Sequence, residues 1–139
     1  MSVLDSHQNL AHEWRLLQNQ FDSYEKHSLI IKLVSVTLCA VAGLFGSGNA
    51  ELVFLLVVLW IQDAIWKTFQ SRIEYRLLAI EAAFRNDSEI EALQFNSAFL
   101  ESRPGAAGLC LEYFSQCVRP TVIFPHLFLV IYQVVICIT

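Results

Sequence analysis

Two long apolar runs, residues 29–45 and 52–66, are separated in this chain only by a short turn at 46–51. The first run has 17 residues and the second has 15. Flanking residues can extend both runs toward the roughly 20 residues that cross about 30 Å of hydrocarbon. The pattern predicts an antiparallel transmembrane hairpin over residues 28–67.

A third apolar run covers residues 121–139 and has no charged residue, although Pro125 lies inside it. Pro120 suits the first turn of a helix, because its missing N–H would have no partner there. The hydrophobic fraction of 55% and the mean hydropathy of +0.49 exceed what a soluble domain needs. The sequence therefore predicts an all-α membrane protein with a third C-terminal span at 120–139.

Residues 1–27 predict an amphipathic helix, because large apolar side chains recur every three or four positions. This stripe consists of Leu10, Trp14, Leu17, Phe21 and Tyr24. The same spacing continues after the second span as far as Phe84, without Gly or Pro, so the second helix should extend well beyond the bilayer. We expect the N-terminal helix to pack on this extension.

The segment 68–119 is expected to be a cytoplasmic helical region. A capping-box pattern at 88–91 predicts a short helix that ends near Phe95. Residues 97–108 contain Gly and Pro and predict a loop, and residues 109–118 predict a second short amphipathic helix.

The basic residues predict the orientation of the chain. All nine Lys and Arg lie at Lys32, in the N-terminal arm or in the segment 67–119, so the positive-inside rule places both segments in the cytoplasm. The C-terminus is then expected outside, and we expect no secretory signal at the polar N-terminus. The net charge of −4 and the lack of a basic cluster exclude a nucleic-acid partner.

Each span of the hairpin carries a single charge. Lys32 lies 16 residues before Gly48 and Asp63 lies 15 residues after it, so the two charges should share a depth in the hairpin. A lone charge there costs roughly 2.5 to 3.5 kcal/mol, and pairing or snorkelling lowers that cost. Three interpretations are open. The pair locks the two helices together, or Lys32 simply snorkels to the surface. In the third, the pair lines a polar path with Gln62 when several hairpins assemble.

A stripe of small residues on the first span consists of Ser35, Cys39, Ala42 and Gly46. Small side chains let helices approach closely in lipid. The stripe serves either the hairpin itself or a neighbouring subunit, and the sequence favours the first.

No residue pattern indicates a catalytic, metal or cofactor site. Cys110 and Cys117 have no His at metal-ligand spacing and are interpreted as buried thiols. His126 and Gln133 share a face of the last span, which favours an interhelical contact over a proton relay and makes them further polar lining candidates.

Two short motifs resemble a known family. The segment SLIIKLVSVTL at 28–38 and the segment LWIQDA at 59–64 resemble the two spans of SLATT-type membrane effectors of bacterial conflict and phage-defence systems. Glu74-Tyr75-Arg76 stands one helical turn later than the corresponding Glu, aromatic and Arg of that family. The likeness covers about residues 8 to 85. It implies a bacterial inner-membrane protein that oligomerises and compromises the membrane.

Three functional classes follow from these patterns. The leading hypothesis is a homo-oligomeric inner-membrane effector or pore-type component, and the resemblance implies a role in bacterial antiphage defence. The alternative is a non-conducting scaffold that recruits a soluble cytoplasmic partner through residues 1–27 and 68–119. An enzyme is the least supported class, and we expect no cofactor; the lipid bilayer and further copies of the chain are the expected partners.

Overall fold

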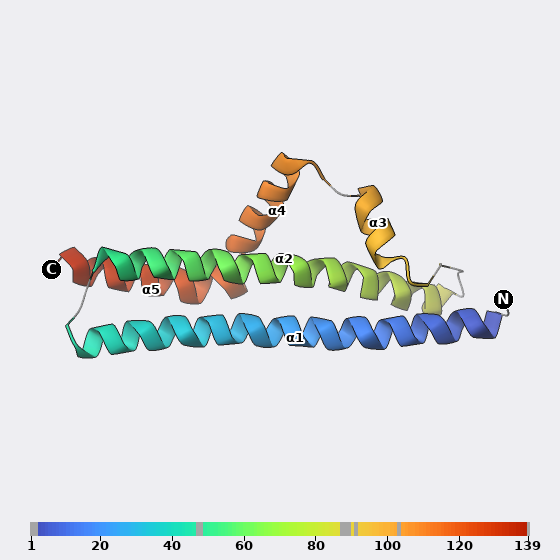
Figure 1. The fold of residues 1–139 in the computed structure, drawn as a ribbon, viewed down its shortest axis with the longest axis horizontal. Coiled ribbons are helices and arrows are strands. Elements are labelled where there is room, and N and C mark those ends of the chain that lie inside the picture. Colours follow the sequence, from blue (N-terminus) through green and yellow to red (C-terminus); the bar gives the residue numbers. More distant parts are fainter. Residues whose placement is uncertain (1–2, 47–48, 87–89, 91, 103, 139) are drawn as a thin grey trace.

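The computed structural model describes residues 3–46, 49–86, 90, 92–102 and 104–138, and every regular element in them is a helix. The elements are α1 (Val3–Leu44), α2 (Ala50–Asn86), α3 (Phe95–Ser102), α4 (Ala106–Cys117) and α5 (Pro120–Ile138). The prediction of an all-α fold is confirmed for these residues. Figure 1 shows α1 and α2 running antiparallel along the whole molecule, with α5 beside them at one end and α3 and α4 forming an arch over α2.

The two longest helices are continuous across the predicted membrane boundary. α1 has 42 residues and α2 has 37, so the N-terminal arm and the first span form one helix rather than two. No Gly or Pro occurs before Gly43 in α1 or anywhere in α2, which removes the usual causes of a kink. The α2 N-terminus is capped by Asn49, whose Oδ1 accepts a hydrogen bond from the Leu52 N–H at 3.0 Å.

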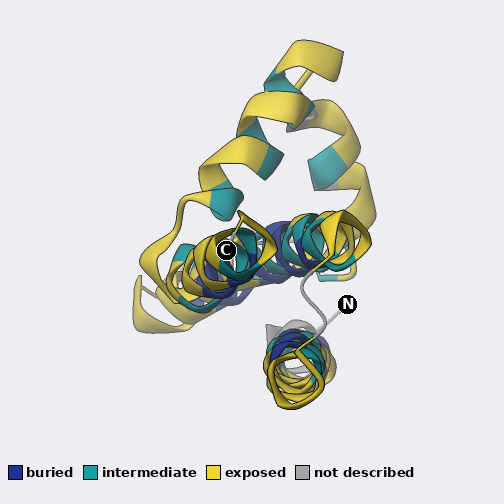
Figure 2. Cartoon of the chain, turned by 90° about the vertical axis from the view of Figure 1, so that its left-hand side faces the viewer, coloured by how far each residue is buried: buried dark blue, intermediate teal, exposed yellow. Residues whose placement is uncertain are grey.

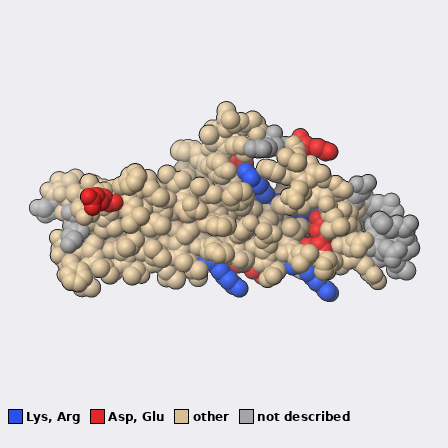
Figure 3. Space-filling view, in the orientation of Figure 1, with Lys and Arg blue, Asp and Glu red and all other residues tan. Residues whose placement is uncertain are grey.

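Three helices are long and apolar enough to cross a membrane, namely α1, α2 and α5. They pack together in what we call the apolar half of the molecule, residues 28–44, 50–67 and 120–138. Figure 2 shows the buried positions where the helices face one another and the exposed positions on the outside. The exposed surface of the apolar half is largely apolar, with examples at Leu33, Phe54 and Phe128. Lys and Arg in Figure 3 lie over the middle and right-hand part of the visible face, away from the left-hand end of the apolar half.

The remaining lengths of α1 and α2, residues 7–27 and 68–86, form the polar half. Its core is a cluster of buried apolar residues from both helices: Leu10, Leu17, Ile73, Leu77 and Ile80. Trp14, Phe21 and Tyr24 pack against this cluster. The predicted stripe of the N-terminal arm therefore does pack on the extension of the second span.

The region between α2 and α5 differs from the predictions. The predicted helix at 88–95 is not found in its described residues, Ile90 and 92–94, while Ser88, Glu89 and Glu91 lie outside the described residues. α3 begins at Phe95, within the stretch expected to end a helix, and covers part of the predicted loop. The prediction was wrong because a capping motif cannot reveal the turn at Leu93, whose φ of 64° is left-handed. The predicted helix at 109–118 corresponds to α4.

Candidate functional site

A buried polar cluster joins all three helices of the apolar half. Its centre is Asp63 of α2, which is fully buried. One carboxylate oxygen, Oδ1, accepts a hydrogen bond from the Ser28 hydroxyl of α1. The other, Oδ2, lies 3.3 Å from the Lys32 Nζ and 3.2 Å from the His126 Nε2 of α5. Both carboxylate oxygens are therefore used, as a buried charge requires.

Lys32 is held by two acceptors rather than one. Its Nζ donates a hydrogen bond to the Ser28 Oγ at 2.9 Å, while it also pairs with Asp63. Ser28 and Lys32 are four residues apart on α1 and so share a helix face. The Lys32 side chain is only 20% exposed, so it lies mostly between the helices of the apolar half. This position fits an interhelical lock better than a lysine that snorkels to the surface.

His126 links the cluster to α5. Its ring is fully buried and lies parallel to that of Trp60, with ring centroids 6.5 Å apart and an interplanar angle of 11°. With its proton on Nε2, the imidazole donates to Asp63, and its Nδ1 has no hydrogen-bond partner among the described residues. Trp60 in turn donates from Nε1 to the Cys117 carbonyl at 3.1 Å, which fixes the end of α4.

His126 and Gln133 of α5 were predicted to share one face of the helix, and they do share one. Both His126 and Gln133 are fully buried between the helices. Ser35 of α1 is also fully buried and donates to the Ile31 carbonyl at 2.9 Å. Polar groups thus continue from the Asp63 cluster along the interior of the apolar half.

Gln62 does not belong to this interior. It is exposed, although its neighbour Asp63 is fully buried. Consecutive helical residues point about 100° apart, and the residue that shares the buried face with Asp63 is Ala64, on the side away from Gln62. Gln62 and Asp63 therefore do not share a face within one chain, and a polar path that both line when several hairpins assemble stays a prediction.

The small-residue stripe divides into two parts. Ser35 and Cys39 are buried between the helices of the apolar half, where Cys39 packs with Leu56 and Leu129. Ala42 is half-buried, and Gly46 is exposed with a φ of 61°, beyond the end of α1. Gly46 is therefore a turn residue and not part of the packing face. A residue outside the predicted stripe makes the close contact instead: a Cβ added to Gly43 would lie 3.1 Å from the Tyr132 hydroxyl.

The sequence also missed a buried ion pair in the polar half. Glu13 of α1 is 4% exposed and accepts two hydrogen bonds from Arg76 of α2, from Nε at 2.9 Å and from Nη2 at 3.2 Å. Its Oε2 also accepts the Leu93 N–H at 2.7 Å. One carboxylate therefore ties α1, α2 and the turn before α3 together. The heptad-like stripe gave no signal for Glu13, because this residue directly precedes Trp14 and lies outside the stripe.

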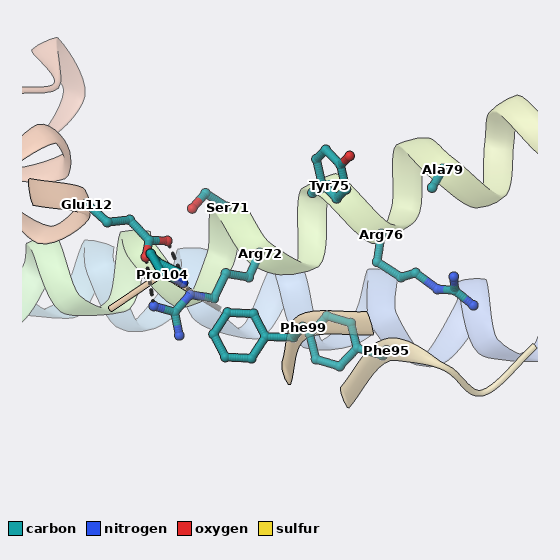
Figure 4. Close-up of a pocket in the computed structure, with 9 residues that line it drawn as sticks. All are labelled: Ser71, Arg72, Tyr75, Arg76, Ala79, Phe95, Phe99, Pro104 and Glu112. Carbon is teal, nitrogen blue, oxygen red and sulfur yellow. Dashed lines mark hydrogen bonds and ion pairs between the residues drawn. The ribbon is translucent and has the colours of Figure 1, made fainter. Parts of the chain in front are cut away.

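A second ion pair holds the arch. Arg72 of α2 donates to Glu112 of α4 from Nε at 3.2 Å and from Nη2 at 3.0 Å, and its guanidinium stacks 4.5 Å from the Phe99 ring centroid. The hydrogen bonds to Glu112 raise the pKa of Arg72, so this residue stays charged. A cavity of about 440 Å³ lies under the arch (Figure 4), lined by Tyr75, Phe95 and Phe99 among others.

In the described part of the chain, no group of three His, Cys, Asp or Glu side chains lies close enough together to hold a metal ion. The interpretation of the cysteines needs one correction, since Cys110 is exposed and Cys117 is half-buried. Comparison of the chain with models of known families, with curated proteins and with solved structures finds no significant match.

Proposed function

We propose that the protein is an inner-membrane effector that acts as a homo-oligomer and opens a polar path through the bilayer. The observation that carries this proposal is the polar interior of the apolar half. Five residues there are at most 1% exposed: Ser28, Ser35, Asp63, His126 and Gln133. Ionisable residues at membrane depth are costly and often line ion or proton pathways, so Asp63 and His126 support a conducting role in addition to their structural one.

The outer surface supports the step to an oligomer. Three helices alone enclose only side chains, and a water-filled path needs more copies. Gln62 exposes an amide on an otherwise apolar part of α2, next to Val58 and Ile61. An amide in lipid is stabilised by hydrogen bonds to another helix, which contribute about 0.6 to 2 kcal/mol each. In this proposal Gln62 lies at the contact between copies, and Asp63 lies inside each copy.

Leakage from liposomes tests the proposal. Purified protein reconstituted in vesicles of phosphatidylethanolamine and phosphatidylglycerol should release a trapped dye. The change Gln133→Met keeps the side-chain size and removes the amide from the interior, so it should lower leakage several-fold without changing the oligomeric state. Gln18→Met is the matched control, because Gln18 lies in the polar half and its amide bonds only an exposed Asp22. An oligomer that never leaks would contradict the proposal.

A non-conducting scaffold is the second candidate function, and the surface of the arch favours it. Leu100 of α3 and Leu111 and Phe114 of α4 are each about two-thirds exposed. These side chains lie outside the membrane in the proposed orientation, where exposed apolar residues often bind another protein. A photo-crosslinker placed at Leu111 in cells should capture a soluble protein if the scaffold account is right, and one placed at the exposed Arg85 should not.

A further inference from the structure

A second cavity, of about 400 Å³, opens between α1, α2 and the first turn of α5. Three lysines line it: Lys26 and Lys32 of α1 and Lys67 of α2. Among the described residues, the only acidic one in the lining is Glu25. The charges of the lining, together with that of Asp63, which pairs with Lys32, therefore sum to +1 at neutral pH, which favours an anionic occupant.

The three lysines are not all neutralised by the fold. Lys32 is paired with Asp63, whereas Lys67 donates one hydrogen bond to the neutral Gln70 Oε1 at 2.7 Å. An ammonium group has three donors, so Lys67 retains N–H groups for another acceptor. Lys26 is exposed beside them. Thr121 also lines the cavity, and the N-terminus of α5 adds a partial positive charge at this point.

The position of the cavity indicates the kind of anion. It lies where the polar half meets the apolar half, at the end of the surface formed by Leu29, Ile30 and Leu33, each more than half exposed. An apolar surface directly beside a basic cavity suits a molecule with acyl chains and a phosphate. None of the described lining residues is aromatic, so they offer no ring on which a nucleotide base could stack.

We propose that this cavity, the basic cavity, binds the headgroup phosphate of an anionic phospholipid from the leaflet on the side of the polar half. Lys26 and Lys67 contact the phosphate diester, and the acyl chains lie along α1 over Leu29 and Leu33. Lys32 remains paired with Asp63, so Lys26 and Lys67 are the cations that meet the phosphate. The inference rests on the proposed membrane location but not on pore activity. It assigns a lipid requirement to the same three-helix junction that holds the polar cluster.

Native mass spectrometry of the detergent-solubilised full chain tests the site. Phosphatidylglycerol should bind in preference to phosphatidylcholine, and Lys26→Gln with Lys67→Gln should weaken its affinity roughly 25-fold. This figure assumes about fivefold for each basic residue near an anionic headgroup. The double change Arg15→Gln with Arg85→Gln is the matched control, since both arginines are exposed in the polar half. The charge-keeping double change to Arg at 26 and 67 should restore binding.

Two outcomes would overturn the proposal. Equal losses in the lysine and arginine variants would show that overall charge, not this cavity, attracts the lipid. Displacement of phosphatidylglycerol by an equimolar amount of inorganic phosphate would assign the cavity to a free anion. Flotation of the same variants with vesicles reports insertion separately. Protein that floats without lipid preference contradicts the lipid site alone, and protein that does not float contradicts the membrane function as well.

Discussion

The two halves of the molecule are built from the same two helices but with opposite distributions of polarity. In the polar half the buried cluster is apolar, from Leu10 to Ile80, and most exposed positions are polar. In the apolar half most exposed positions are apolar, and polar residues such as Asp63 and His126 are fully buried. One continuous pair of helices therefore changes which side chains it buries at about the level of Ser28 and Thr68.

This difference shows how each half is held together. In water, burial of apolar surface stabilises the contact between helices. In lipid that gain disappears, because the acyl chains are as apolar as leucine, and helices associate through packing and hydrogen bonds instead. We therefore expect the polar half to depend on its leucines and isoleucines, and the apolar half to depend on the Asp63 cluster.

The largest effect should come from breaking the cluster of the apolar half. The change Asp63→Asn leaves the Lys32 charge without its buried partner, and the loss of one partner of a buried pair costs about 3 to 5 kcal/mol. The loss of stability is measured as the change in the free energy of unfolding in detergent micelles. The double variant with Lys32→Met should recover much of the loss. Losses that simply add would show that the two residues do not interact.

A matched pair of leucine truncations compares the two halves directly. Leu77→Ala in the polar half should cost about 2 to 5 kcal/mol, as for other buried leucines in water. Leu129→Ala in the apolar half should cost only about 1 kcal/mol, because lipid or detergent offers the exposed surface an equally apolar environment. The two leucines are similarly buried, at 5% and 8% exposure. Equal losses in the free energy of unfolding for Leu77→Ala and Leu129→Ala would argue that both halves lie in the same environment, water or lipid.

The exception within the polar half gives the third prediction. Glu13 is a buried charge among apolar residues, and Glu13→Gln should cost about 1.5 to 3 kcal/mol by weakening its bonds to Arg76 and Leu93. Hydrogen exchange should then quicken at the Leu93 amide. The exposed Glu74 of α2 is the matched control, and Glu74→Gln should leave that amide unchanged. Unchanged exchange in the Glu13 variant would mean that the turn before α3 is held by other contacts.

The smallest effect concerns the turn where the two spans meet. Gly46 has a φ of 61° with open space around its Cα, so Gly46→Ala should cost about 1 kcal/mol through backbone strain alone. Gly43→Ala makes a contact with the movable Tyr132 hydroxyl instead, and the added change Tyr132→Phe should relieve it. Thermal unfolding in detergent distinguishes the two glycine variants. The added change Tyr132→Phe should raise the melting temperature of the Gly43→Ala variant and leave that of the Gly46→Ala variant unchanged.

Much of this fold could be predicted because its signals are local. The apolar runs predicted the hairpin, and equal spacing from the turn predicted that Lys32 and Asp63 meet, as they do at 3.3 Å. The periodicity from Leu10 to Tyr24 predicted the contact with α2. These predictions need only the helical repeat and a tight turn.

The remaining contacts depend on how separate helices rotate and slide against each other. The contact of His126 with Asp63 requires the register of α5, which is set through α3 and α4. That Gln62 faces outward and Asp63 inward depends on the rotation of α2, and a single sequence does not define it. The role of Ser28 had one available signal, its position one turn before Lys32.

The continuity of α1 has a mechanical consequence. About 22 residues separate Leu10 from Lys32, or roughly 33 Å at the helical rise, and no Gly or Pro interrupts them. A helix without a hinge transmits twist along its axis. Rotation of α1 at Trp14, where its indole bonds Glu81 of α2, therefore turns Lys32 relative to Asp63 without any loop to absorb the motion. A change in how α1 packs on α2 in the polar half is therefore expected to alter the contact between Lys32 and Asp63 in the apolar half.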